Sequence, residues 1–205
     1  MISLGDRSLY LCTPLRDDLD AFLRSCLDGG VDIVQLREKD ASAQARREGA
    51  ELCRSICHEF NVPFIVNDDP ELALAVGADG VHVGQDDQSV ATCRGLLGPD
   101  VIVGLSTHAE DELLDGTTQA VTYLSAGPVE ATPTKPGRRG TGIEYIEFAL
   151  SHAEVPVFVT GGVTPESVAT LGAHGVRHFV VVRSLTHATD PRRQAEKLRL
   201  AIDLL

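Results

Sequence analysis

Short runs of apolar residues, many of them β-branched, recur along the whole chain, and a stretch with helical spacing follows each one. Most of the runs are continuous rather than alternating, which is typical of strands covered on both faces and therefore of a parallel sheet. The pattern predicts eight strands, at Leu9–Thr13, Asp32–Leu36, Phe64–Asn67, Gly80–Val83, Ile102–Ser106, Thr122–Ala126, Val157–Thr160 and Phe179–Val182.

The segments between these runs predict helices. In residues 49–60, apolar side chains recur three and four positions apart, which makes one apolar stripe along a helix. The stripe consists of Gly49, Leu52, Cys53, Ile56, Cys57 and Phe60. Three other helices have a clear start, where a capping side chain precedes a proline at the first helical position. These pairs are Asp69 with Pro70, Thr164 with Pro165, and Asp190 with Pro191.

The number and order of the elements predict the fold. Eight strand-then-helix units in 205 residues fit an α/β protein with one (βα)8 TIM barrel, near the lower size limit of that fold. We therefore expect a single domain over residues 1–205. An open, doubly wound sheet is the alternative, but it needs a phosphate-binding glycine turn after the first strand. Thr13, Pro14 and Leu15 stand there instead, which favours the closed barrel.

Composition narrows the range of partners. The net charge is −12 and the chain has 6 Phe, 3 Tyr and no Trp, which argues against binding a nucleic-acid backbone or stacking on its bases. No apolar run approaches the roughly 18 residues of a membrane span, and the N-terminus lacks a basic flank before an apolar core. We expect no membrane partner and no signal peptide, and the pattern carries no signal for an oligomeric state.

The five cysteines are odd in number, and no two of them have C-x-x-C spacing. Cys53 and Cys57 lie one helical turn apart, a spacing that also suits a metal, but the helical stripe favours burial as small apolar side chains. No cysteine stands where a catalytic nucleophile is expected. Reduced cysteines predict a cytoplasmic protein.

Chemistry in a TIM barrel belongs at the carboxyl ends of the strands. Gln35, Arg37 and Lys39 alternate at the end of the second strand and so face the same way. Two cations and an amide in the barrel mouth predict an anionic ligand, because a buried cation without a partner is costly. The alternative is a structural network in which Arg37 pairs with Glu38, Asp40 or a neighbouring acidic side chain.

Carboxylates end the next two strands. Asn67 and Asp68 follow the third strand, and Asp86 and Asp87 follow the fourth, whereas Asp69 is expected to cap a helix. Because consecutive barrel strands lie side by side, Asp68 and one of Asp86 or Asp87 are candidates to share Mg²⁺, with water and phosphate oxygens completing the octahedron. Caps and turns are the alternative for these aspartates.

The later strand ends add groups suited to phosphate. Ser106 ends the fifth strand as a neutral donor, and His108 is either an acid or base or part of the next helix start. Gly161 and Gly162 precede a helix start, where backbone N–H groups bind phosphate, and Arg183 follows the eighth strand. The long segment 127–141 carries hydroxyls and cations and predicts a loop that closes on phosphate, or else a solvated basic loop. Its candidate residues are Thr132, Thr134, Lys135, Arg138 and Arg139.

Several of these motifs together resemble those of the thiamine phosphate synthase family, TIM-barrel transferases of thiamine biosynthesis. The resemblance covers nearly the whole chain. It rests on Q-L-R-E-K at 35–39, N-D-D at 67–69, A-D-G-V-H-V-G-Q-D-D at 78–87, S-T-H at 106–108, G-P-V-E-A-T-P-T-K at 127–135 and G-G-V-T at 161–164.

The resemblance implies that hydroxymethylpyrimidine diphosphate and thiazole phosphate, both small-molecule substrates, are joined to give thiamine phosphate and diphosphate. It assigns Mg²⁺ to Asp68 and Asp87. It assigns the pyrimidine diphosphate to Gln35, Arg37, Lys39, Asn67, Ser106 and Lys135, of which Arg37, Lys39 and Lys135 would act on the leaving group. It assigns the thiazole phosphate to Thr132, Thr134, Gly162, Val182 and Arg183. Arg183 is a departure, because the family commonly has serine there; the phosphate contact would pass to the guanidinium or to Ser184.

Three other functions compete with the synthase. A thiazole tautomerase-like barrel would not need Asp68, Asp87 and Lys39 together, and their joint presence favours the synthase. A phosphate-binding isomerase or aldolase would need an acid/base pair or a Schiff-base lysine inside the barrel. A non-catalytic protein that binds thiamine phosphates would have no use for a metal beside the leaving group.

Overall fold

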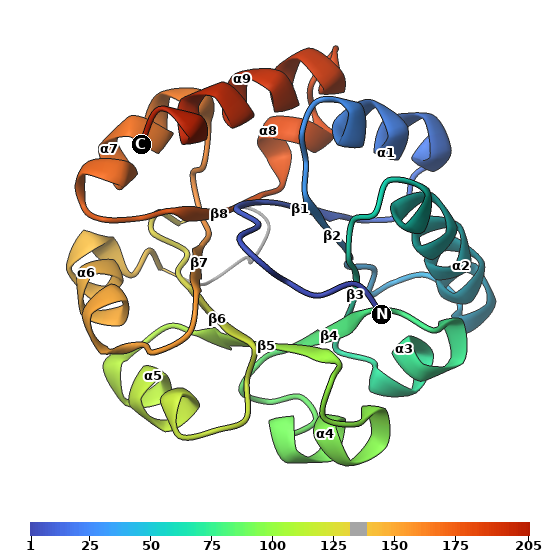
Figure 1. Cartoon of the computed structure of the whole chain (residues 1–205), viewed down its shortest axis with the longest axis horizontal. Helices are drawn as coiled ribbons and strands as arrows, with labels where there is room; N and C mark the ends of the chain where they lie inside the picture. The colour runs from blue at the N-terminus through green and yellow to red at the C-terminus, as the bar shows by residue number, and fades with distance from the viewer. Residues whose placement is uncertain (132–138) are drawn as a thin grey trace.

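A closed barrel of parallel strands forms the centre of the molecule, and helices surround it (Figure 1). The computed structural model describes residues 1–131 and 139–205. Its eight strands pair in chain order, and β8 closes the ring on β1. They are β1 (Leu9–Thr13), β2 (Ile33–Leu36), β3 (Phe64–Asn67), β4 (Gly80–Val83), β5 (Ile102–Thr107), β6 (Tyr123–Ala126), β7 (Val157–Val159) and β8 (His178–Val181). The TIM barrel expected from the sequence is confirmed.

The helices connect successive strands on the outside of the barrel. They are α1 (Leu19–Asp28), α2 (Ala43–Glu59), α3 (Pro70–Val76), α4 (Val90–Leu97), α5 (Glu110–Thr117), α6 (Gly142–His152), α7 (Pro165–Ala173), the single turn α8 (Arg183–Thr186) and α9 (Pro191–Asp203). The three expected starts are confirmed, because the side chains of Asp69, Thr164 and Asp190 accept backbone N–H groups of α3, α7 and α9.

Several strand limits differ from the expected ones by one residue. Asp32 stands before β2, and its carboxylate accepts the N–H groups of Ser8 and Leu9. Thr122 stands before β6, where its hydroxyl accepts the N–H of Val103. β7 ends before Thr160, and β8 runs from His178 to Val181 rather than from Phe179 to Val182.

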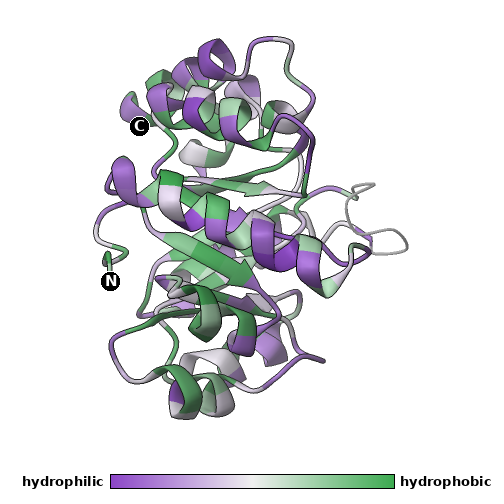
Figure 2. Ribbon diagram, turned by 90° about the vertical axis from the view of Figure 1, so that its right-hand side faces the viewer, coloured by the Kyte–Doolittle hydropathy of each residue, from purple (hydrophilic) through white to green (hydrophobic). Residues whose placement is uncertain are grey.

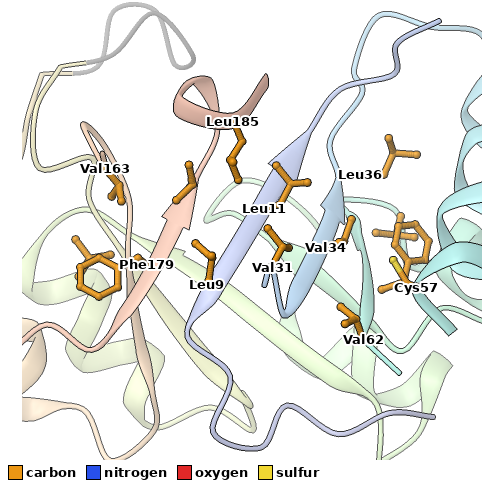
Figure 3. Packing of buried hydrophobic residues seen from close by; sticks show 14 of the residues in the cluster. Leu9, Leu11, Val31, Val34, Leu36, Cys57, Val62, Val163, Phe179 and Leu185 are labelled. Carbon is orange, nitrogen blue, oxygen red and sulfur yellow. The ribbon is translucent and has the colours of Figure 1, made fainter. Parts of the chain in front are cut away.

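Alternate residues of each strand divide the core into two parts. Outward-facing residues pack against the helices, as Leu9 and Leu11 of β1 do (Figure 3). Inward-facing residues form a smaller cluster inside the ring, composed of Leu4, Tyr10, Ile33, Ile65, Ile102, Tyr123 and Phe158. Figure 2 shows that the strands are mostly hydrophobic, whereas the helices mix both kinds of residue. The barrel is therefore filled and is not a pore.

The N-terminal segment covers one end of the barrel (Figure 1). Leu4 packs in the inner cluster, and the backbone N–H of Ile2 donates to Asp79 Oδ1 at 2.6 Å. The other Asp79 oxygen accepts the N–H of Phe64 and lies 3.2 Å from His58 Nε2. Because this segment covers the amino ends of the strands, the carboxyl ends are left for a site.

Gly104 makes room for two inward-facing rings. It pairs in register with His82 on β4 and with Tyr123 on β6. The two rings stack, with centroids 5.6 Å apart and planes 19° apart. A Cβ on Gly104 would overlap the Tyr123 ring and lie 2.6 Å from His82 Nδ1. Both neighbours are held by packing, so neither ring can move aside without disturbing the other.

We expect Gly104→Ala to lower the free energy of unfolding by about 1–3 kcal/mol, the usual cost of overpacking a filled core. Gly95→Ala is the matched control, because a Cβ there meets no described atom within 4 Å and Gly95 lies inside α4. The control should gain about 0.5–1 kcal/mol from the lower helix cost of alanine. Urea unfolding of both variants measures the difference, and equal effects would contradict the packing described here.

Candidate active site

A cavity of about 710 Å³ opens at the carboxyl ends of the strands. It is lined by every described residue that the sequence analysis assigned to substrate or metal, namely Gln35, Arg37, Lys39, Asn67, Asp68, Asp87, Ser106, Gly162, Val182 and Arg183. These residues come from six different strand ends, and the register of the barrel brings them to one place. Thr132, Thr134 and Lys135, like Arg138, lie outside the described residues.

The cationic side chains that follow β2, Arg37 and Lys39, line the cavity as their spacing predicts. Lys39 Nζ lies 2.8 Å from Asp68 Oδ2. Within residues 1–131 and 139–205, Arg37 forms no ion pair, so the alternative of a structural network with Glu38 or Asp40 is wrong. The Glu38 carboxylate instead accepts the N–H groups of Leu15 and Asp40. An unpaired guanidinium beside a cavity favours an anionic ligand.

The two carboxylates proposed for metal are held by the backbone around them. Asp68 has φ of 62°, in the left-handed region, and its N–H donates to the carbonyl of His82 on the neighbouring strand. Asp87 Oδ2 accepts the N–H of Gly84 at 2.8 Å, which closes the turn after β4. Asp86 also lines the cavity, so proximity alone does not separate it from Asp87.

This donor set fits Mg²⁺ better than a structural metal. In the described part of the chain, no three His, Cys, Asp or Glu side chains are grouped so as to hold a metal ion. Mg²⁺ is usually held by one or two carboxylates and completed by water and substrate phosphate, which Asp68 and Asp87 would allow. Lys39 already balances the charge of Asp68, and a bound cation would compete with it.

The floor of the cavity is polar, which the sequence analysis missed. Tyr10, Cys12, His82, Tyr123 and Ser125 line it together with Gln35 and Ser106. His82 is buried and hydrogen-bonded to Tyr123 and Ser106. The missed signal was the alternation along the strands: each of these residues stands an even number of positions from another inward-facing one.

The glycines after β7 form the opposite wall. Gly161 and Gly162 have φ of 96° and 75°, values that side chains other than glycine's rarely allow. Thr164 then caps α7 through a reciprocal pair of hydrogen bonds with Ser167. This turn leaves backbone close to the cavity at the start of a helix, where phosphate binds well.

The end of β8 supplies a second guanidinium. Arg183 begins α8 and forms no ion pair with other described residues. The neighbouring Ser184 hydroxyl accepts a hydrogen bond from Gln194 of α9 at 2.9 Å. Arg37 and Arg183 also line an adjoining cavity of about 310 Å³ beside β1. Both Arg183 and Ser184 line the main cavity, and Arg183 adds a positive charge there.

The described ends of the segment 127–141 are held beside the cavity. Val129 N–H donates to the carbonyl of Thr160, and Thr141 N–H donates to the carbonyl of Pro128 at 2.8 Å. The segment therefore leaves the barrel and returns to it next to the turn of Gly161 and Gly162, with Pro128 in the cavity wall.

His108 is fixed by the helix that follows it. Glu112 Oε2 accepts the N–H of His108 at 2.8 Å and lies 3.0 Å from its Nδ1. His108 stands one residue before the N-cap Ala109, so it is part of the helix start, although its ring lines the cavity.

All five cysteines are buried and stand outside any disulfide. Burial raises the pKa of Cys53 to about 12 and that of Cys57 well above its ordinary value. Both thiols therefore behave as apolar side chains, as predicted. Cys12 differs from Cys53 and Cys57 in location, because it lines the floor of the cavity. None of the described helices is long and apolar enough to cross a membrane.

The fold and site together define a TIM barrel with a cavity at the carboxyl ends of its strands, in which cationic and acidic side chains from several strand ends are gathered. A family model described as thiamine monophosphate synthase matches residues 9–185. The chain belongs to this family.

Individual relatives agree with the family. A thiamine-phosphate synthase of Mycobacterium tuberculosis is 39% identical over 97% of this chain and 96% of its own length. One from Synechocystis is 40% identical over 93% of this chain, but the chain spans about half of that relative's length (56%). The solved structure of thiamine phosphate pyrophosphorylase from Pyrococcus furiosus superposes with a TM-score of 0.88, at 28% identity, over 98% of this chain and 97% of that one.

We expect the left-handed backbone at Asp68 to make this position sensitive to side-chain type. Asp68→Asn keeps a residue that tolerates this conformation, whereas Asp68→Ala does not, so the alanine variant should be less stable than the asparagine variant by about 1 kcal/mol. Both variants lose the ion pair with Lys39, so comparing them in urea unfolding isolates the backbone effect. Equal stabilities would argue against a strained turn.

Proposed function

We propose that the protein is a thiamine-phosphate synthase. It joins hydroxymethylpyrimidine diphosphate to thiazole phosphate, and it releases thiamine phosphate and diphosphate. The observation that carries the proposal is the single cavity lined by Arg37, Lys39, Asp68, Asp87 and Arg183. Two anionic substrates and a diphosphate leaving group need that combination of cations and metal-binding carboxylates.

The residues on β2 to β5 are proposed to bind the pyrimidine diphosphate. Arg37 and Lys39 stabilise the negative charge that grows on the departing diphosphate. Lys135, which is not among the residues that the structure describes, is proposed to have the same role. Gln35, Asn67 and Ser106 supply neutral hydrogen bonds to the same substrate. The ion pair of Lys39 with Asp68 supports this arrangement, because it brings a diphosphate-binding cation and a proposed metal ligand within 2.8 Å of each other.

Mg²⁺ is the proposed cofactor. When bound, it withdraws charge from the diphosphate oxygens and makes diphosphate a better leaving group. Asp68 and Asp87 would hold it, and the Gly84 N–H donates to Asp87 Oδ2, which keeps that carboxylate oriented in the turn after β4. Lys39, released from Asp68 by the cation, would be left to contact the diphosphate.

The other wall is proposed to bind the thiazole phosphate. Gly162 and Val182 offer backbone at two neighbouring strand ends, and Arg183 adds a charge. Thr132 and Thr134 are proposed to complete this subsite.

The reaction needs no base. The bond between the pyrimidine methylene carbon and the diphosphate oxygen breaks, and its electron pair leaves with diphosphate. The thiazole nitrogen then uses its own lone pair to form the new C–N bond and becomes quaternary. The protein's part is to hold the two fragments together and to stabilise the leaving charge. We further propose that residues 1–205 act as one catalytic domain, in the cytoplasm, on small-molecule substrates.

A direct assay tests the proposal. The purified protein is incubated with both substrates, with and without Mg²⁺, and diphosphate and thiamine phosphate are quantified together. Equimolar products that require Mg²⁺ are expected. Conversion of a thiazole isomer without diphosphate release would favour the tautomerase, and binding of thiamine phosphate without turnover would favour a non-catalytic protein.

We expect Asp87→Asn to lower kcat by roughly 100-fold, because a neutral amide cannot hold the cation that neutralises the leaving group. Asp86→Asn is the matched control, since this neighbouring carboxylate lines the same cavity but is not proposed as a ligand. Its turnover should stay close to that of the unmodified protein. Steady-state kinetics at saturating Mg²⁺ measure both, and the reverse ranking would transfer the ligand role to Asp86.

We expect Arg183→Ser to raise the KM for thiazole phosphate by roughly 2- to 5-fold and to leave kcat nearly unchanged. Arg183 is exposed, so its interaction with phosphate is screened by solvent and modest in size. The KM for the pyrimidine diphosphate serves as the internal reference. An unchanged KM for thiazole phosphate would show that Arg183 does not contact it.

A further inference from the structure

A continuous line of hydrogen bonds crosses the cavity floor from β2 to β5. Gln35 Nε2 donates to the Tyr10 hydroxyl at 2.7 Å, and the Tyr10 and Tyr123 hydroxyls lie 2.9 Å apart. The Tyr123 hydroxyl lies 2.9 Å from His82 Nδ1, and His82 Nε2 lies 2.8 Å from Ser106 Oγ. At the other end, the Cys12 thiol donates to Gln35 Oε1 at 3.4 Å.

Every residue in this line of hydrogen bonds is buried. Tyr10 and Tyr123 are fully enclosed, and Gln35, His82 and Ser106 are less than 9% exposed. Burial raises the pKa of both tyrosines well above its ordinary value, so each phenol keeps its proton and has a single hydrogen to donate. An unsatisfied buried donor is costly, so the arrangement of protons follows from counting donors and acceptors.

Counting donors and acceptors gives this line of hydrogen bonds one direction. The amide nitrogen of Gln35 can only donate, so the Tyr10 hydroxyl accepts from it and donates its own hydrogen bond to the Tyr123 hydroxyl. Tyr123 then donates to His82 Nδ1. A neutral imidazole that accepts at Nδ1 carries its proton on Nε2, and this N–H donates to Ser106 Oγ. The hydroxyl proton of Ser106 is left to point into the cavity.

The opposite direction does not fit the Gln35 amide as it is oriented in the structure. It would make Tyr10 donate to Gln35, which requires the amide to be turned over. The amide nitrogen would then face the Cys12 thiol, and the thiol would lose the Gln35 oxygen that accepts its hydrogen. Without the amide turned over, the Tyr10 proton would have no acceptor in this chain.

We infer that Tyr10, Tyr123 and His82 are positioning residues that orient the Ser106 hydroxyl as a hydrogen-bond donor to the ligand. The order runs from the Gln35 amide to the Ser106 oxygen, so the Ser106 hydrogen is not used within these bonds and is available to the ligand. A donor there favours ligand atoms that accept, such as phosphate oxygens. That the ligand is the diphosphate rests on the proposed function, but the order of the protons does not.

The tautomer of His82 tests the order directly. In protein with ¹⁵N-labelled histidine and no ligand, long-range ¹H–¹⁵N spectra should show Nε2 of His82 protonated and Nδ1 unprotonated, with the resonance assigned by its loss in His82→Asn. A proton on Nδ1 in the unmodified protein overturns the proposal, whether or not the protein turns out to be a synthase.

Variants of Gln35, the first donor in this line of hydrogen bonds, test what sets the direction of the bonds. Gln35→Met removes the first donor but adds no acceptor, so Tyr10 still donates to Tyr123 and the tautomer should be retained. Gln35→Glu, under conditions where its carboxyl ¹³C shift indicates ionisation, accepts the Tyr10 proton through a charge-assisted bond and should move the imidazole proton to Nδ1. Tyr145→Phe is the matched control, because it deletes a buried phenol that donates to Thr107 outside this chain. A switch in the control, or none in ionised Gln35→Glu, contradicts the inference.

The affinity for inorganic diphosphate, measured by calorimetry with Mg²⁺ present, tests the consequence for a ligand. Ser106→Ala should weaken binding roughly 3- to 10-fold, the effect of one hydrogen bond. Tyr123→Phe should also weaken binding, but it should add little in the Ser106→Ala background, because it acts through that hydroxyl. Additive effects, or no effect of Ser106→Ala, would overturn the ligand-directed role, and Tyr145→Phe should bind as the unmodified protein does.

Discussion

The alternation of side chains along closed, parallel strands is the constraint on which the rest of the structure depends. In a closed barrel every second residue of every strand must point inward, and the register decides which of these lie at the same height. Here the inward positions near the amino ends are apolar, with Leu4, Ile33, Ile65 and Ile102 closing that end. One step further along the strands they become polar, as at Gln35, His82 and Ser106. The same periodicity therefore produces the apolar layer that closes the amino end of the barrel and the polar site at the carboxyl end.

Positively charged side chains gather at the cavity although the protein as a whole is acidic. The chain carries a net charge of −12, yet Arg37, Lys39 and Arg183 line one cavity. Of these, only Lys39 has a carboxylate partner among the described residues, and that partner is the proposed metal ligand Asp68. Asp68, Asp86 and Asp87 line the same cavity, so its cations act as individual contacts for an anion beside the carboxylates proposed for metal.

Much of the fold and part of the site could be predicted from the sequence, because both depend on local periodicity. A spacing of two placed Gln35 of β2 and the following Arg37 and Lys39 at the same cavity, and the capping residues placed the starts of α3, α7 and α9. The buried chain through Tyr10, Tyr123 and His82 could not be predicted, because it joins strands far apart in sequence and depends on the register between them. Space beside Gly104 for two rings is likewise a property of three paired strands. The choice between Asp86 and Asp87 came from family resemblance, and both line the cavity.

The central claim is that carboxylates from β3 and β4 hold a divalent cation against a diphosphate bound by the cations of β2. Crystals grown with Mn²⁺ and inorganic diphosphate test it most directly through the anomalous scattering of manganese. The account predicts one strong peak coordinated by Asp68, Asp87 and diphosphate oxygens, with Arg37 and Lys39 on the same diphosphate. A peak away from these carboxylates, or diphosphate bound in the cavity with no metal beside it, would contradict the account.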